Sequence, residues 1–143
     1  MNRALLSRLS LGPYSEFIQK FKSSRYEFIG VELHDTLDRH DRSGHKMLAS
    51  GHQGQVNFHF DDILSAIDGT NAVAITLVHN HPRVGSELRP SRKDIHVTEV
   101  VHQDLLKIGL QVLDHRIYGA NGDCLSFVDA QVGRWGWEVL AFP

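Results

Sequence analysis

Two histidines separated by one residue stand at the end of the most apolar run in the sequence. The run covers residues 72–78 (AVAITLV), and His79, Asn80, His81 and Pro82 follow it. An apolar run of this length with several β-branched side chains predicts a buried strand. Side chains at i and i+2 of a strand point to the same face, so His79 and His81 lie side by side while Asn80 faces away. Two neutral imidazoles in this arrangement supply part of the ligand set of a zinc site.

Two carboxylates complete the chemistry that the histidine pair suggests. Asp94 follows His81 by thirteen residues and is a candidate third ligand. A zinc hydrolase leaves its fourth coordination position to water, and the metal lowers the pKa of that water to about 7. A carboxylate must then move the proton to the leaving group, and Glu27 is the best candidate for this base. Glu27 lies where the first predicted helix meets the first predicted strand, so pairing of that strand with the histidine strand would bring it to the metal.

Alternating helices and strands must position these residues. Gly12-Pro13 opens a helix that ends near Ser23-Ser24, with Tyr14, Phe17, Ile18 and Phe21 on its apolar face. A second helix is predicted to be capped by Asp61 or Asp62 and to end at Gly69. A third helix is predicted from Ser91 to Gly109, and its inward face consists of Ile95, Thr98, Val101, Leu105 and Ile108. Strands are predicted at 28–33, 46–49, 55–58, 72–78, 110–118 and 124–128, the last two joined by a turn at 119–122. This alternation predicts an α/β fold, a single-domain mixed β-sheet sandwiched by helices.

The histidine motif resembles a known family once the following segments are included. His79-Asn80-His81-Pro82 and the later run 90–95 (PSRKDI) resemble the signature of RadC-type proteins, which belong to the JAB/MPN superfamily of JAMM zinc metalloproteases. Residues 27–35 (EFIGVELHD) match the family's glutamate and first strand, and 113–115 (LDH) with Ser126-Phe127 match its closing strands. The resemblance covers roughly residues 13–128. It implies a cytidine-deaminase-like fold, with an N-terminal extension at 1–12, a RadC-like JAB/MPN domain at 13–128 and a C-terminal tail at 129–143.

The resemblance also implies roles for individual residues. His79, His81 and Asp94 would hold Zn²⁺, Glu27 would be the general acid/base, and Ser91 would donate a hydrogen bond to the developing oxyanion. The expected function is a zinc-dependent metallohydrolase of the JAMM type, a peptidase or isopeptidase acting on a peptide or isopeptide-linked protein substrate. The loop at 82–90 holds nine residues where the family pattern usually has seven, and we expect it to bulge beside Asp94.

Two other functions remain open from the sequence. The longer loop and the short chain also suit a catalytically silent scaffold or binding module with the same fold. The family association with DNA repair suggests a DNA-acting protein. However, full-length RadC proteins carry an N-terminal helix-hairpin-helix module, which we do not expect in these 143 residues because the predicted domain begins near residue 13. The net charge of −2 also gives no basic excess, so nucleic acid is not expected as a partner.

Several residues have a structural interpretation beside the chemical one. Ser91 and Asp94 have the spacing of a helix capping box, and Glu27 has the position of a plain surface carboxylate. His115 is interpreted first as a buried, hydrogen-bonded histidine. Alternatively, Asp114 and His115 form a pair that orients a metal ligand. The remaining expectations are that Glu32 is solvated, that Cys124 belongs to the core, that Trp135 and Trp137 dock on the body or on a partner, and that His34, His40, His45, His52 and His59 are exposed.

The composition limits the cellular setting. The chain has 143 residues, enough for one domain with a core, and 41% of them are hydrophobic while 22% are charged. One cysteine excludes an internal disulfide and suits a reducing compartment. No stretch approaches the ~20 apolar residues of a membrane span, and no secretory signal is evident, so we expect a cytoplasmic protein with no membrane partner.

Overall fold

A central mixed β-sheet organises the computed structural model, which describes residues 13–22, 25–51, 57–82 and 88–133. Its five strands lie in the order β2-β1-β3-β4-β5. β1 pairs antiparallel with β2 and β3, β3 pairs parallel with β4, and β4 pairs antiparallel with β5. The strands are β1 (Glu27–His34), β2 (Gly44–Gly51), β3 (Ala74–His81), β4 (Gln111–Gly119) and β5 (Cys124–Ser126), and the helices are residues 13–22, α2 (Phe60–Ile67) and α3 (Arg92–Leu106).

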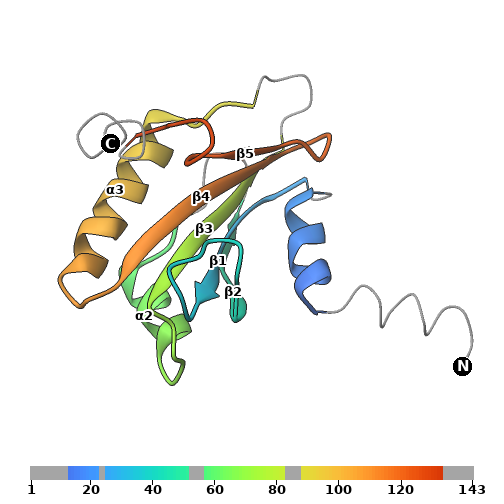
Figure 1. Cartoon of the computed structure of the whole chain (residues 1–143). Helices are drawn as coiled ribbons and strands as arrows, with labels where there is room; N and C mark the ends of the chain where they lie inside the picture. Colours follow the sequence, from blue (N-terminus) through green and yellow to red (C-terminus); the bar gives the residue numbers. More distant parts are fainter. Residues whose placement is uncertain (1–12, 23–24, 52–56, 83–87, 134–143) are drawn as a thin grey trace, which may run out of the picture.

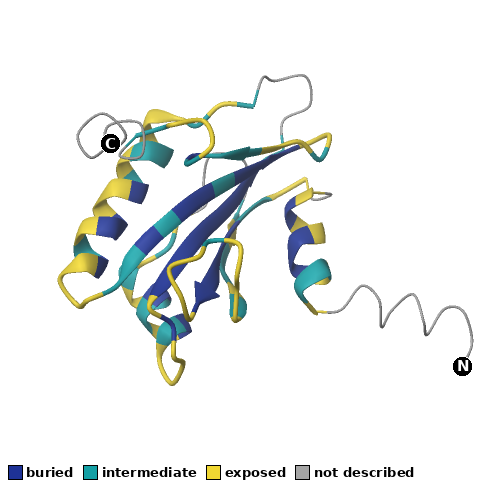
Figure 2. Cartoon of the chain, in the orientation of Figure 1, coloured by how far each residue is buried: buried dark blue, intermediate teal, exposed yellow. Residues whose placement is uncertain are grey.

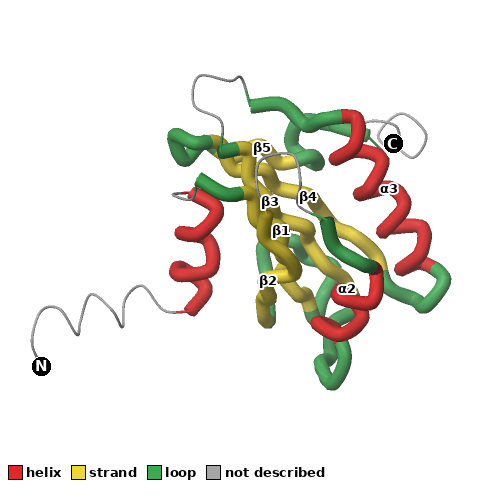
Figure 3. The backbone as a smooth tube through the Cα atoms, turned by 180° about the vertical axis from the view of Figure 1, so that it is seen from behind, coloured by secondary structure: helices red, strands yellow, loops and turns green. Residues whose placement is uncertain are grey.

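Helices cover both faces of this sheet. α2 and α3 lie on one side, and the helix at 13–22 lies on the other (Figures 1 and 3). The α2/α3 side holds the larger apolar core, in which Ile63, Leu77 and Leu105 are fully buried. The opposite side holds a smaller cluster built on Phe17 and Phe21. The predicted α/β sandwich is therefore confirmed, and β3, at its centre, is buried along nearly its whole length (Figure 2). Among the described residues, none of the helices has both the length and the apolar character needed to cross a membrane.

Most predicted elements are present, with shifted ends. The buried strand begins at Ala74 rather than Ala72, because the chain bends at Val73, which is 38% exposed. α3 ends at Leu106, so Ile108 falls beyond the helix and is exposed instead of facing inward. The predicted turn between the last two strands is present, with Gly122 at a φ of 86° that favours glycine.

Two local predictions are wrong. A strand was expected at 55–58, but Asn57 and Phe58 belong to no strand. Residues 55–56 lie outside the described part of the chain. The second helix is capped at His59 rather than at Asp61 or Asp62. Asp62 still contributes, because its carboxylate accepts a hydrogen bond from the backbone N–H of His59 at 2.8 Å.

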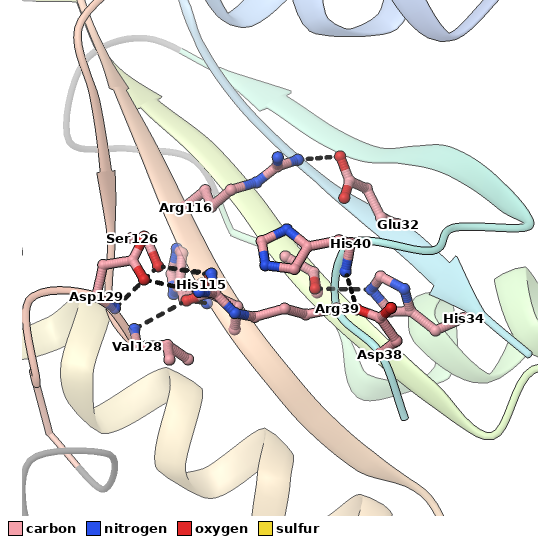
Figure 4. Close-up of polar contacts among 12 residues, drawn as sticks. Glu32, His34, Asp38, Arg39, His40, His115, Arg116, Ser126, Val128 and Asp129 are labelled. Atoms are coloured by element: carbon pink, nitrogen blue, oxygen red, sulfur yellow. Dashed lines mark hydrogen bonds and ion pairs between the residues drawn. The ribbon is translucent and has the colours of Figure 1, made fainter. Parts of the chain in front are cut away.

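Three predictions of exposure or burial are also wrong. Glu32 and His34 are buried because β1 is a central strand covered on both faces, and Glu32 forms an ion pair with Arg116 of β4 (Figure 4). Cys124 is exposed, because it begins the edge strand β5. His40 and His59 are exposed as expected, His45 is half-buried, and His52, Trp135 and Trp137 lie outside the described residues.

Candidate metal centre

The three predicted ligands meet at the end of β3. The Nε2 atoms of His79 and His81 are 3.0 Å apart. The Asp94 carboxylate lies beside both, with Oδ1 3.2 Å from His79 Nε2 and Oδ2 3.1 Å from His81 Nε2. The structure therefore brings together His79, His81 and Asp94 in the arrangement that the spacing predicted, with donor atoms within 4.8 Å of one another.

The start of α3 fixes the position of Asp94. Ser91 is the N-cap of this helix, and its Oγ accepts a hydrogen bond from the Asp94 backbone N–H at 3.0 Å. In return, Asp94 Oδ2 accepts from the Ser91 backbone N–H at 2.7 Å. The capping-box interpretation is confirmed, and it coexists with the metal-site geometry because the carboxylate still faces the two imidazoles. Residues 83–87 of the longer loop are outside the described part, yet Asp94 is in place.

The donor set suits a divalent ion that accepts nitrogen and oxygen ligands. Burial opposes the ionisation of Asp94, but its polar partners, which include the Ser91 backbone N–H, outweigh burial and hold the pKa of this carboxyl well below its usual range. Zinc binds imidazole nitrogen and carboxylate oxygen at about 2.0–2.2 Å, so two tetrahedral ligands lie about 3.4 Å apart. The observed donor separations of 3.0–3.2 Å are close to this spacing. These residues therefore fit a zinc ion with few rearrangements.

Glu27 reaches the same site from the neighbouring strand. Ile29 pairs with His79 across β1 and β3, and Glu27 lies two residues earlier, on the same face. The Asn80 side chain holds this part of β1 from the opposite face. Its Oδ1 accepts from the Phe28 N–H at 2.7 Å, and its Nδ2 donates to the Tyr26 carbonyl at 2.9 Å. Asn80 thus fixes the backbone on both sides of Glu27, a role that strand alternation alone did not reveal.

A cavity of about 520 Å³ joins these groups. Glu27, His79, His81, Ser91 and Asp94 all contribute to its lining. The wall between β1, α2 and α3 is largely apolar and is formed by Ile29, Phe58, Phe60, Val97, Val100 and Val101. The site therefore combines a candidate metal centre and a carboxylate with an apolar surface beside them.

Behind His79 lies a buried polar layer that the sequence only partly indicated. His115 Nε2 is 2.7 Å from His79 Nδ1, and His115 Nδ1 is 2.6 Å from Thr98 Oγ1. Burial holds the pKa of His115 well below its usual value. The first interpretation of His115 is therefore confirmed, since it is buried and hydrogen bonded, and it also contacts a candidate ligand. Thr98 was predicted only as a core-facing residue, although a hydroxyl on an apolar helix face was a signal.

Comparisons with known proteins agree on one family. The model of the RadC-like JAB domain matches residues 15–132. A UPF0758 protein of Geotalea uraniireducens is 33% identical over 116 residues, which cover 81% of this chain and 49% of the relative. A UPF0758 protein of Nitrosococcus oceani is 30% identical over 129 residues, covering 89% of this chain and 49% of the relative. The chain thus spans about half the length of these curated relatives.

Proposed function

Because the chain belongs to the RadC-like JAB domain family of the JAB/MPN superfamily, we propose that it is a zinc-dependent hydrolase of peptide or isopeptide bonds. His79, His81 and Asp94 would hold the ion. When bound there, zinc lowers the pKa of a water ligand to about 7 and polarises the carbonyl under attack. The observation that carries the proposal is that these three donors and Glu27 line one cavity, although they come from three separate elements.

The chain's own residues supply the proton transfer. The Glu27 carboxylate takes a proton as water adds to the carbonyl carbon, and it gives that proton to the nitrogen that leaves when the C–N bond breaks. The Ser91 Oγ accepts from the Asp94 N–H, and its own hydroxyl proton can then be donated to the oxygen that becomes negative. The apolar wall beside these groups suits an aliphatic or aromatic side chain of the substrate.

Substitution of Glu27 by glutamine tests this assignment. Glu27→Gln keeps the shape of the side chain but removes the base, so we expect one zinc ion per chain in both proteins. Cleavage should fall by about 10²–10⁴-fold in the variant. A mixture of peptides with diverse, defined sequences, incubated with each zinc-loaded protein and analysed by mass spectrometry, measures cleavage whatever the natural substrate is.

The same measurements separate hydrolysis from the scaffold alternative. Cleavage that is undiminished in Glu27→Gln would remove Glu27 from the mechanism. Wild-type protein that takes up no stoichiometric zinc would favour a binding module with the same fold. Cleavage that persists in a His81→Ala protein without zinc would point to a contaminating protease.

A further inference from the structure

A chain of buried polar contacts connects His79 to helix α3. Thr98 Oγ1 is 2.6 Å from the backbone carbonyl oxygen of Asp94 and 2.6 Å from His115 Nδ1. His115 Nε2 is in turn 2.7 Å from His79 Nδ1. All three side chains are at least 95% buried, and the His115 ring stacks on Phe127 with centroids 4.5 Å apart. Because water is excluded, each of these short contacts must contain one proton from the groups themselves.

The number of available protons determines which group donates in each of these hydrogen bonds. The Asp94 carbonyl can only accept, so the single hydroxyl proton of Thr98 lies on that bond. The contact between Thr98 and His115 must then hold a proton from His115 Nδ1. A neutral His115 has no proton left for Nε2, so its contact with His79 holds the proton of His79 Nδ1. A charged His115 is disfavoured because its ring is buried and stacks on Phe127, and the cost of burying a charge outweighs the attraction of the Asp94 carboxylate.

We propose that Thr98 and His115 are positioning residues that hold His79 in the tautomer protonated at Nδ1, which leaves the Nε2 lone pair facing His81 and Asp94. The identity of the ion rests on the function proposed above, but the tautomer is a property of the chain itself. In this arrangement His79 Nε2 and Asp94 Oδ1 lie 3.2 Å apart with no proton between them. A cation bound between a lone pair and a carboxylate removes their repulsion.

Loss of the Thr98 hydroxyl should disturb this order. In Thr98→Val, His115 Nδ1 no longer has an acceptor, which favours moving the His115 proton to Nε2. His79 Nδ1 must then accept, and the His79 proton moves to Nε2, where it hydrogen bonds to Asp94 and competes with a metal. Thr98→Ser keeps the hydroxyl and is the matched control.

Nitrogen-15 NMR of the histidine rings tests the tautomer in zinc-free protein. At about pH 8, above the ordinary histidine pKa, we expect His79 to carry its proton on Nδ1 in wild type and Thr98→Ser, and on Nε2 in Thr98→Val. Zinc affinity, measured by competition with a chromophoric chelator, should fall by about 10–100-fold in Thr98→Val and stay within about 3-fold of wild type in Thr98→Ser.

The outcomes distinguish this inference from the proposed function. Wild-type His79 protonated on Nε2 would overturn the inference even if every variant failed to fold. Wild-type affinity and an unchanged tautomer in Thr98→Val would also overturn it, while leaving the zinc centre intact. A wild-type protein with His79 protonated on Nδ1 that binds no zinc would support the positioning role and contradict the hydrolase.

Discussion

Ser91 illustrates how one residue satisfies two demands. Its Oγ caps α3 by accepting from the Asp94 N–H, and the same contact holds the Asp94 carboxylate beside the histidines. The sequence presented capping and chemistry as rival interpretations. In the folded protein they do not conflict, because the cap uses a lone pair of the hydroxyl whereas oxyanion stabilisation uses its proton. What the pattern S-x-x-D could not indicate is that a strand end with two histidines faces this cap.

Two substitutions of Ser91 separate these demands. Ser91→Ala should lower the free energy of unfolding by about 1 kcal/mol, whereas Ser91→Gly should cost only a few tenths, because glycine is tolerated at an N-cap. Chemical denaturation measures this difference. If Ser91 also stabilises the oxyanion, peptide cleavage should fall by about 10²–10³-fold in both variants with zinc content unchanged. Cleavage that is lost in Ser91→Ala but retained in Ser91→Gly would restrict Ser91 to capping.

At the scale of elements, the helix at 13–22 is held to the sheet by a buried polar network as well as by aromatic packing. The Tyr14 hydroxyl donates to Glu32 of β1 at 2.6 Å. Arg116 of β4 forms an ion pair with the same carboxylate (Figure 4). Phe17 and Phe21 pack beside it edge to face, with centroids 5.0 Å apart. The sequence predicted the apolar face of this helix, but it did not reveal that the helix covers Glu32.

Tyr14→Phe tests this network through its pH dependence. Burial, and then the hydrogen bond to Glu32, raise the pKa of Tyr14 above its usual value of 10.0. A group that binds its proton more tightly in the folded state contributes stability that is complete below its unfolded pKa and is lost as the pH rises through the folded pKa. Tyr14→Phe should therefore be less stable than wild type by about 1 kcal/mol at pH 8, and the gap should narrow above about pH 10.

Urea denaturation at a series of pH values measures both proteins. Tyr118, whose pKa is also raised, is present in both and cancels from the difference. If the stability difference between the two proteins stays constant up to about pH 11.5, Tyr14 has the same pKa in the folded and unfolded states, which would contradict this prediction.

At the scale of the whole molecule, local patterns predicted the elements, and the family resemblance predicted how they meet. The run before His79 indicated a buried strand, and the alternation of helices and strands indicated a mixed sheet. Periodicity could not show that β1 lies between β2 and β3, which is why Glu32 and His34 were expected in water. The roles of Asn80 and Thr98 were not predicted for the same reason. Their partners are brought to them only by tertiary packing: Tyr26 and Phe28 to Asn80, and His115 to Thr98.

Zinc should stabilise the entire fold, because its proposed ligands tie the end of β3 to the start of α3. An ion that binds only the folded state adds RT ln(1 + [Zn]/Kd), about 2.7 kcal/mol when free zinc is 100 times Kd. For a chain of this size, that corresponds to a rise in Tm of roughly 10 °C, which differential scanning fluorimetry with and without chelator would measure. Glu27→Gln should keep the rise, and His81→Ala should lose most of it. An equal rise in His81→Ala would show that zinc binds elsewhere, for instance at the exposed His59 or His96, and would argue against this centre.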